Sequence, residues 1–328
     1  MATHLSRFAT TPTSGLVFSE NRLQMAFLEE VNRWRYSAEV PTLAEAEAYC
    51  AALARSHYEN FPVVSWLLPR RLHQHFYNVY AFCRWSDDLA DEVGDPARSL
   101  ELLAWWRGEL GACNAGCVRH PVFVALQKTI QQFSIPREPF ADLISAFEQD
   151  QTVHEYQTID QLLDYCRRSA NPVGRIVLRM AECDTPNHVA WSDSICTGLQ
   201  LANFWQDVAR DAQIGRSYLP RADRQRWGYT DEQLSFRRST PEFVALMRSE
   251  VDRARDCLLS GMPLVSAVPS WLQVDIDLFI QGGLQILQEI EKIEFQVWEV
   301  RPVVSKWTLA RLLTGSVGRW VTRRVRGS

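Results

Sequence analysis

Helical signals recur along almost the whole chain, whereas the two-residue alternation typical of half-buried strands is nearly absent. Thr42 with Glu45 forms a capping box, in which side chains bind the free amides of a helix start. Thr240 followed by Pro241 marks another start, because proline at the first helical position loses no needed hydrogen bond. Only 15 glycines and 15 prolines occur among 328 residues, so few breakers interrupt the helices. The sequence therefore predicts an all-α protein.

Glycine and proline breaks divide the chain into helices of bundle length with short connections, and no internal repeat is visible. We expect one continuous domain at 41–300, a partly disordered N-terminal extension at 1–40 and a basic amphipathic segment at 301–328. A further helix is expected to begin at Thr158, where Gln161 completes a second capping box. The expected helices cover residues 42–56, 69–93, 97–113, 121–133, 137–154, 158–180, 187–212, 271–300 and 305–324, with another starting at Thr240.

The composition argues against several classes of protein. A net charge of −4 and a pI near 6.0 argue against nucleic-acid binding, which normally shows as a basic domain. No apolar run approaches the roughly 18 residues of a membrane span, and the start has no signal-peptide core. Residues 1–19 lack acidic side chains, which is compatible with a transit peptide but more typical of a frayed terminus. We expect a cytoplasmic protein.

Eight cysteines are spread along the chain without a paired CxxC motif. Reduced thiols, typical of the cytoplasm, are therefore expected. Cys113, Cys117 and His120 lie close in sequence, but a metal site would need a fourth ligand. We interpret these three as packing and loop residues.

The segment YAFCRWSDDLADE, residues 80–92, places a polar stripe on one expected helix. Tyr80, Arg84, Asp87 and Asp91 follow at steps of three or four residues, and such steps return to the same helical face. Large apolar residues flank this stripe on the same helix.

A second stripe lies far downstream, in the segment LQLANFWQDVARD at 199–211. Gln200, Asn203, Asp207 and Asp211 follow at spacings of three, four and four on an otherwise apolar helix. Burying bare carboxylates costs several kcal/mol each, so they must meet water, cations or a ligand. A single stripe of this kind is typical of a solvated surface, but two stripes flanked by apolar residues favour a binding site.

Carboxylates four residues apart on two helices suit Mg²⁺, a hard ion that bridges carboxylates to substrate phosphates. The expected ligand is a diphosphate, which becomes a better leaving group when metal and arginine neutralise its charge. Its departure creates a carbocation, and an apolar pocket lined by aromatic faces stabilises such a cation. The chain has 12 Trp, nine Tyr and 15 Phe, although most aromatic residues fill cores.

These two stripes, followed by GRSYLP at 215–220, resemble the two aspartate-rich motifs of the squalene/phytoene synthase family of head-to-head prenyl transferases. The resemblance covers about residues 45–300. It implies a single-domain isoprenoid-synthase helical bundle, in which both motifs face a central cavity and hold Mg²⁺. The metal ligands that the resemblance implies are Asp87, Asp88, Asp91, Asp207 and Asp211.

The resemblance also assigns roles to neighbouring residues. Tyr165 matches a pocket tyrosine implicated in catalysis, and Arg84 is given both a catalytic and a diphosphate-binding role. Arg210 stands where many relatives carry an acidic residue, which leaves the number of metal ions open. The residues that match contacts of the diphosphate or of the metal site are Arg84, Gln200, Asn203, Arg216 and Tyr218.

Two further segments, HYENFPVVSWLLP at 57–69 and SANPVGR at 169–175, resemble the branch of the family that makes hydroxysqualene. That branch implies ionisation of presqualene diphosphate, rearrangement of the cation and capture by water, a carbon–oxygen lyase reaction of squalene and hopanoid biosynthesis. A presqualene diphosphate synthase would hand over the substrate. His57, Asn60 and Arg175 match diphosphate-binding or nearby cationic positions, but a structural hydrogen-bonding role is an equal alternative for His57.

Asn171 and Pro172 replace a small Ala-Gly step that is common elsewhere in the family. Proline removes a backbone donor and typically kinks a helix, and carbonyls freed at the kink would hold a water molecule. We therefore place Asn171 among the catalytic residues, as part of the site where water captures the cation.

The chain has no acidic residue beyond Glu299 but seven basic ones. A basic amphipathic helix with tryptophan suits an anionic membrane surface. A final helix that packs on the core explains the same pattern, and the two readings are compatible. The apolar face of this helix consists of Trp307, Ala310, Leu313, Val317, Trp320 and Val321.

Three functions remain open. The first is a Mg²⁺-dependent lyase acting on presqualene diphosphate, for which NADPH is not expected. The second is a transferase that condenses two prenyl diphosphates to squalene, presqualene diphosphate or phytoene; the absence of a Rossmann glycine fingerprint counts little against it, since relatives that use NADPH lack one too. The third is a helical scaffold with solvated acidic stripes, but the repeats usual in scaffolds are missing.

Overall fold

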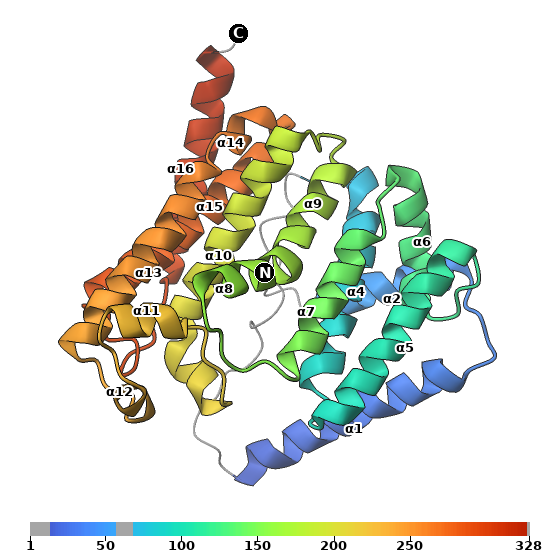
Figure 1. Cartoon of the computed structure of the whole chain (residues 1–328). Coiled ribbons are helices and arrows are strands. Elements are labelled where there is room, and N and C mark those ends of the chain that lie inside the picture. The colour runs from blue at the N-terminus through green and yellow to red at the C-terminus, as the bar shows by residue number, and fades with distance from the viewer. Residues whose placement is uncertain (1–13, 57–67, 327–328) are drawn as a thin grey trace. The chain divides into compact units, whose positions relative to one another are not determined.

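The structure is a computed structural model that describes residues 14–56 and 68–326. Helices make up most of these residues, and no strand occurs in the two ranges (Figure 1). Glu155 and Ser217 form an isolated β-bridge. The prediction of an all-α protein is confirmed. His57 and Asn60 lie outside the described residues.

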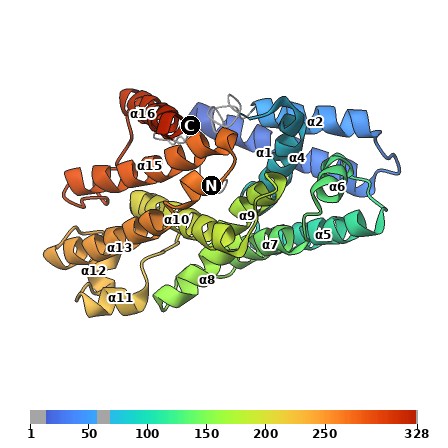
Figure 2. The same cartoon turned by 90° about the horizontal axis from the view of Figure 1, so that it is seen from above.

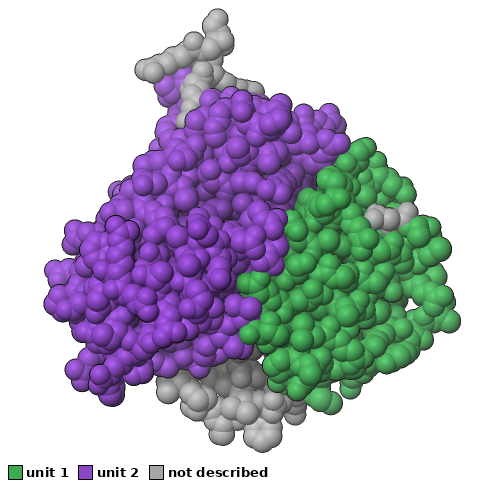
Figure 3. Space-filling view, in the orientation of Figure 1, with its two compact units in different colours: residues 1–152 green, residues 153–328 purple. Residues whose placement is uncertain are grey.

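The helices form two compact units, which divide the chain after Thr152 (Figure 3). In the first unit, α4 packs against α2, α5, α6 and α7, and it therefore lies at the centre of this group. Its core is aromatic, and the rings of Trp85 and Trp106 stack with centroids 5.4 Å apart. The helices of this unit are α1 (Ser14–Tyr36), α2 (Leu43–Ser56), α4 (Arg70–Asp91), α5 (Pro96–Ala115), α6 (Pro121–Phe133) and α7 (Glu138–Asp150).

Helix α1 is a feature that the sequence pattern did not predict. It carries no acidic residue in its first turn, and its apolar and polar residues are only weakly segregated. Tertiary contacts hold it instead. The ring of Phe27 lies 5.3 Å from that of Trp85, and Gln24 Nε2 donates to the Val93 carbonyl at 2.9 Å. Packing onto α4 thus stabilises a helix whose own signals are weak.

In the second unit, the 28-residue helix α10 lies between α9 and α13 and also packs on α8, α14 and α15 (Figures 1 and 2). Thr185 caps its start and Pro186 occupies its first turn. The helices of this unit are α8 (Ile159–Ser169), α9 (Asn171–Met180), α10 (Pro186–Gln213), α11 (Arg221–Arg226), α12 (Asp231–Ser235), α13 (Pro241–Ser260), α14 (Leu264–Ala267), α15 (Ser270–Lys292) and α16 (Lys306–Arg326).

Three of the expected helix boundaries are wrong. The helix expected at 158–180 is two helices, α8 and α9, which meet at Ala170 because Pro172 occupies the first turn of α9. The helix expected at 271–300 ends at Lys292, and Glu294 and Phe295 follow in the left-handed region with φ of 53° and 60°. The helix expected at 137–154 ends at Asp150.

Helix α16 packs on α15. Arg319 Nη2 binds the buried Asp277 carboxylate at 2.7 Å, and Trp320 Nε1 donates to the Ser270 carbonyl at 3.0 Å. The prediction that this segment packs on the core as a final helix is therefore confirmed for the side of α16 that faces α15. No helix in the described ranges is long and apolar enough to cross a membrane.

All eight cysteines are free thiols. Cys113 is buried, and its thiol lies 3.8 Å from the Phe123 carbonyl. His120 is also buried, accepts a hydrogen bond from the Val122 amide at 3.2 Å and lies among tryptophan rings, including Trp85 at 4.4 Å. These contacts confirm packing roles for Cys113 and His120, and Cys117 is exposed.

Candidate active site

Helix α4 carries the first carboxylate stripe. Its Arg84 guanidinium binds Asp88 through two contacts, Nε to Oδ2 at 3.0 Å and Nη2 to Oδ1 at 2.5 Å. The same guanidinium lies 3.6 Å from Asp87 Oδ2. Asp87 is only 6% exposed, and its Oδ1 has no hydrogen-bond partner among the described residues. This stripe is therefore buried and only partly neutralised.

Burial controls the charge of this stripe. It raises the pKa of Asp87 well above the ordinary range, and the neighbouring Asp91 adds to the rise because like charges oppose ionisation. Burial also raises the pKa of Asp88 to about 7, although the pairing with Arg84 opposes the rise. Burial lowers the pKa of Arg84 but its pairing with Asp88 and Asp87 outweighs this, so the net shift is upward. These carboxylates would ionise readily beside an additional cation.

Helix α10 carries the second stripe, with its four residues on one face. Asp207 and Asp211 are 3% and 4% exposed, which excludes a solvated acidic surface. Gln200 is also buried, and its Nε2 has no hydrogen-bond partner in the described part of the chain. Asn203 is half-buried. Buried polar groups in a protein core are normally hydrogen-bonded, but the Gln200 amide has a free N–H that could donate a hydrogen bond to an anionic ligand.

An arginine from the C-terminal part of the chain neutralises Asp207. Arg301 Nε lies 2.6 Å from Asp207 Oδ1, and Arg301 Nη2 lies 3.2 Å from Oδ2. Arg210, one turn along α10, approaches the same Oδ1 only to 3.9 Å. Both oxygens of this buried carboxylate thus contact one guanidinium.

The segment that follows α10 lies beside the segment that precedes α8. The Arg216 amide donates to the Asp211 carbonyl at 2.8 Å, which continues the end of α10. The Ser217 amide then donates to the His154 carbonyl at 2.8 Å, and the Arg221 amide donates to the Tyr156 carbonyl at 2.9 Å. These bonds fix the GRSYLP segment and aim Tyr218 at α10.

Four buried aromatic rings gather where this segment meets α8 and α10. The rings of Phe204 and Tyr218 stack with centroids 3.7 Å apart and planes 10° apart. Tyr165 lies 6.2 Å from Phe204 and 6.1 Å from Tyr218, and Tyr156 lies 5.6 Å from Tyr165. The structure therefore brings the predicted residues Tyr165 and Tyr218 together. Both rings lie against Phe204, which is next to Asn203 on α10. Their faces are suited to stabilising positive charge.

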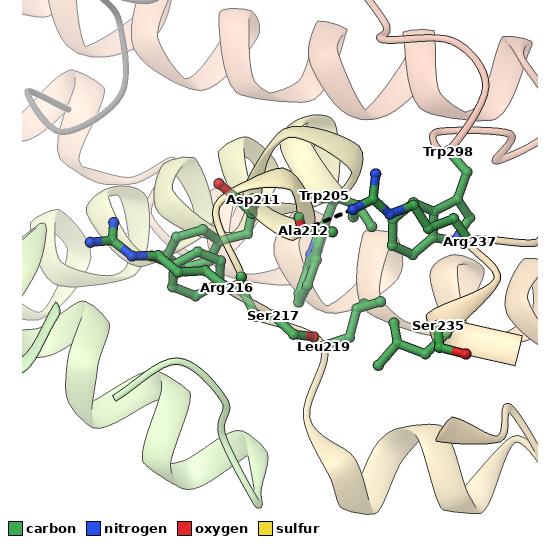
Figure 4. A pocket seen from close by; sticks show the side chains of 14 residues that line it. Trp205, Asp211, Ala212, Arg216, Ser217, Leu219, Ser235, Arg237 and Trp298 are labelled. Atoms are coloured by element: carbon green, nitrogen blue, oxygen red, sulfur yellow. Dashed lines mark hydrogen bonds between the residues drawn. The ribbon is translucent and has the colours of Figure 1, made fainter. Parts of the chain in front are cut away.

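A pocket of about 230 Å³ opens beside the end of α10 (Figure 4). Asp211 and Arg216 lie on one side of it, whereas Arg237 and Trp298 lie on the other side, and Arg237 Nη2 donates to the Ala212 carbonyl at 3.1 Å. Trp205 lines the wall between them and is fully buried, and its Nε1 has no hydrogen-bond partner among the described residues. The pocket combines an apolar wall with polar side chains at its edges.

Two other predicted residues lie elsewhere in the second unit. Arg175 binds Asp193, with Nε to Oδ1 at 3.0 Å and Nη2 to Oδ2 at 2.6 Å. Asp193 precedes Asp207 by 14 residues, or about 21 Å along α10 at 1.5 Å per residue. Asn171 is buried at the start of α9 and accepts a hydrogen bond from Thr197 Oγ1 at 3.0 Å. The structure does not place the Arg175 guanidinium beside Asp207.

The donor set of the two stripes fits a hard divalent cation. Carboxylate oxygens are the ligands that Mg²⁺ prefers, and the unpartnered Asp87 Oδ1 is a buried oxygen that a cation would satisfy. No three His, Cys, Asp or Glu side chains in the described ranges are grouped closely enough to form a metal site by themselves. Arginines occupy Asp88 and Asp207 instead, so a cation at either carboxylate would compete with a guanidinium.

Sequence spacing missed several residues of this region. Arg301 is 94 positions from Asp207 and belongs to a basic stretch for which the sequence suggested membrane contact. Arg237 and Trp298 reach the pocket from the segments after α12 and α15. No local pattern connects such distant positions, although Arg301, two residues after the last acidic residue, marked the start of the basic segment.

The fold and the buried carboxylates show that this is an all-helical protein with two aspartate-rich helices. A model of the squalene/phytoene synthase family matches residues 54–308. The chain belongs to this family, whose members are isoprenoid-synthesising enzymes that act on prenyl diphosphates. A helical scaffold without enzymatic activity is thereby excluded.

Individual relatives differ in their activities. The structure of squalene synthase HpnC from Alicyclobacillus acidocaldarius is similar with a TM-score of 0.74 and 44% identity, covering 77% of this chain and 95% of that one. A hydroxysqualene synthase from Sinorhizobium fredii is 33% identical over 71% of this chain and 80% of its own length. A phytoene synthase from Arthrospira platensis is 29% identical over 81% of this chain and 90% of its own length.

Proposed function

We propose that this protein converts presqualene diphosphate and water to hydroxysqualene and inorganic diphosphate. The observation that carries the proposal is the interruption between α8 and α9, where the SANPVGR segment buries a polar side chain, Asn171, against α10. Similarity to hydroxysqualene synthases at 33% identity and to squalene synthase HpnC at 44% identity supports it. A separate enzyme would supply presqualene diphosphate.

The reaction begins when the ester C–O bond of the substrate breaks and its electron pair leaves with the diphosphate. Arg216 and the free Nε2 donor of Gln200 would bind the diphosphate oxygens, because both groups donate hydrogen bonds to anions. Asp87 and Asp91 on α4, and Asp207 and Asp211 on α10, would each bind Mg²⁺, which when bound neutralises charge on the leaving diphosphate. Charge neutralisation at this point favours the transition state over the bound substrate.

The carbocation left behind needs protection from premature capture. The stacked rings of Phe204 and Tyr218, with Tyr165 beside them, offer π-faces that attract a cation and exclude water. After rearrangement, a water molecule attacks the cation, its oxygen forms the new C–O bond and one proton leaves. The break at Ala170 would offer a place for that water, because the Asn171 side chain is polar and proline cannot donate an amide hydrogen bond to the preceding turn.

The test is to incubate the full-length protein with presqualene diphosphate and Mg²⁺ in ¹⁸O-labelled water, with and without NADPH. We expect hydroxysqualene carrying one ¹⁸O atom, because the hydroxyl oxygen comes from solvent, and no change when NADPH is added. Mass spectrometry of the extracted product measures both. Asp207→Asn should abolish turnover, while Asp252→Asn, at an exposed ion pair on α13, should not.

Two results would contradict the proposal. An unlabelled alcohol would show that water is not the nucleophile, and squalene formed only with NADPH would show that hydride captures the cation. Condensation of two prenyl diphosphates by the same preparation would instead support a transferase, which the similarity to phytoene synthase over 81% of the chain favours as the second candidate.

We also propose that the protein contacts anionic membranes through α16 and the segment before it. Val303 and Trp307 are 66% and 87% exposed, and Lys306 lies between them. Interfacial tryptophan and exposed cations are typical of peripheral membrane binding. Such contact would bring the site close to the lipid phase in which an oily product dissolves.

A further inference from the structure

The contact between Arg301 and Asp207 joins two parts of the second unit that are far apart in sequence. Arg301 lies in the connection between α15 and α16, and residues 299–305 at the end of this connection are here called the strap. Its guanidinium contacts both carboxylate oxygens, at 2.6 and 3.2 Å. The Asp207 side chain is 3% exposed, whereas that of Arg301 is 32% exposed. The carboxylate is therefore fixed in the interior, and the cation reaches it from the surface.

A second bond ties the same strap to the same turn of α10. Gln206 Nε2 donates to the Pro302 carbonyl at 2.7 Å, and this bond is buried. Adjacent residues of α10 thus hold adjacent residues of the strap. Because Pro302 has no amide hydrogen and a restricted φ, the strap enters this contact with few alternative conformations. The side chain of Arg301 is thereby directed towards Asp207.

A guanidinium at this position compensates the charge of the carboxylate, as a bound metal ion would. A buried carboxylate is costly unless a positive charge compensates it, and the planar fork of arginine satisfies both oxygens at once. Oxygens engaged in two short charged hydrogen bonds have fewer lone pairs available for a cation. A divalent cation binding at Asp207 would therefore have to displace Arg301 from at least one oxygen.

We infer that Arg301 is an internal counter-ion that occupies Asp207 in the substrate-free protein and competes with the divalent cation for it. The inference rests on the metal role of Asp207 in the proposed function. Arg301 compensates the negative charge of the buried carboxylate while no metal is bound, and competition of this kind lowers the affinity for metal alone.

The test is to measure binding of Mn²⁺, a paramagnetic substitute for Mg²⁺, by the full-length protein and its variants. Free Mn²⁺ is quantified by electron paramagnetic resonance at pH 8, without and with inorganic diphosphate. Arg301→Gln removes the competing charge, so we expect it to bind Mn²⁺ alone roughly tenfold more tightly than the wild type, a change of the size expected for a charged hydrogen-bond pair. A residue that only positions Asp207 would give the opposite sign, because its loss would loosen the ligand.

Arg210→Gln is the matched control, since Arg210 is 3.9 Å from the same oxygen and its removal changes the net charge equally. It should alter Mn²⁺ affinity by less than Arg301→Gln does. Arg301→Lys is a second variant in case the first fails to fold. Lysine keeps the charge but loses the two-point fork, so its Mn²⁺ affinity should lie between those of the wild type and Arg301→Gln.

The possible failures are distinguishable. If the wild type takes up no Mn²⁺ with or without diphosphate, the metal role in the proposed function is wrong and the inference falls with it. If the wild type binds Mn²⁺ but both Arg301 variants bind it equally or more weakly, the inference alone is overturned. Binding that Arg301→Gln tightens more than Arg210→Gln does supports competition at Asp207, whereas equal tightening by the two variants overturns it.

Discussion

The buried carboxylates of this protein differ in how their charge is compensated. Arg301 binds Asp207, Arg84 binds Asp88 and Arg319 binds Asp277. Asp275, two residues before Asp277 on α15, has no such partner: it is 1% exposed and neither oxygen has a hydrogen-bond partner among the described residues. Burial alone raises the pKa of Asp275 to about 7. The protonation state of this carboxyl group therefore changes near neutral pH without help from a neighbour.

Asp275 should make stability depend on pH. Its pKa is about 7 in the folded protein and about 3.9 in the unfolded chain, so the folded state binds a proton that the unfolded state has lost. The resulting stabilisation is complete below the unfolded value and disappears as the pH rises through 7. We expect the free energy of unfolding to fall by about 1 kcal/mol between pH 6 and pH 8.

Urea unfolding at both pH values measures this change. Asp275→Asn cannot titrate, so the part of the pH dependence due to this residue should vanish in that variant. Asp252→Asn, at an exposed ion pair, should retain the pH dependence of the wild type. Equal slopes for the wild type and Asp275→Asn would show that the Asp275 pKa does not lie between 6 and 8.

At the scale of elements, the contact between α10 and α13 depends on a glycine. A Cβ atom at Gly198 would lie 2.8 Å from Leu258 Cγ and 2.9 Å from the Leu258 amide nitrogen, closer than real side chains approach. The two helices therefore pack backbone to backbone at this level. The close contact therefore sets the rotation of α10 about its own axis. The carboxylate stripe lies on the face of α10 that points away from α13.

Gly198→Ala should consequently destabilise the protein. Alanine favours helix by about 1 kcal/mol over glycine, but forcing a methyl group into this contact costs about 1–3 kcal/mol, so a net loss is expected. Gly108→Ala is the matched control, because Gly108 lies within α5 and a Cβ atom added there would meet no other atom within 4 Å. That variant should gain about 0.5–1 kcal/mol.

Thermal unfolding of both glycine variants compares the two effects directly. A melting temperature for Gly198→Ala at or above that of the wild type would mean that α10 and α13 separate at little cost. Loss of activity in a stably folded Gly198→Ala would show instead that the contact positions the α10 stripe.

At the scale of the whole molecule, the uneven charge distribution leads to a prediction for membrane binding. The chain has a net charge of −4, yet every charged residue after Glu299 is basic. Of these, Arg301 and Arg319 bind buried carboxylates, whereas Lys306 is exposed beside the exposed Trp307, where both side chains can meet a surface. We expect the full-length protein to cosediment with vesicles containing phosphatidylglycerol more than with pure phosphatidylcholine, and less at high salt.

Trp307→Ala should lower the bound fraction, because interfacial tryptophan contributes apolar burial at the surface of the bilayer. Phe236→Ala removes another exposed aromatic ring, after α12, and should leave binding unchanged. Equal binding to neutral and anionic vesicles by all three proteins would contradict a role for the basic segment.

Local pattern was enough to predict most of the long helices and the composition of the stripes. The steps from Gln200 to Asp211 return to one helical face whatever surrounds them, because 3.6 residues per turn is a property of the backbone. Caps such as Thr185 and Thr240 act within a single turn, so they too are readable in the sequence. The resemblance to the family then supplied the chemistry that such stripes support.

The sequence by itself determined the all-α class and both carboxylate stripes, since each follows from interactions over a few residues. Only the tertiary structure decided that α1 docks on Trp85, that Tyr156 joins Tyr165 and Tyr218, and that Arg301 occupies Asp207. These contacts join residues up to 94 positions apart, and their free energy comes from burial and charge pairing in a folded core. No spacing rule along the chain encodes such partners, because packing alone chooses which distant side chains meet.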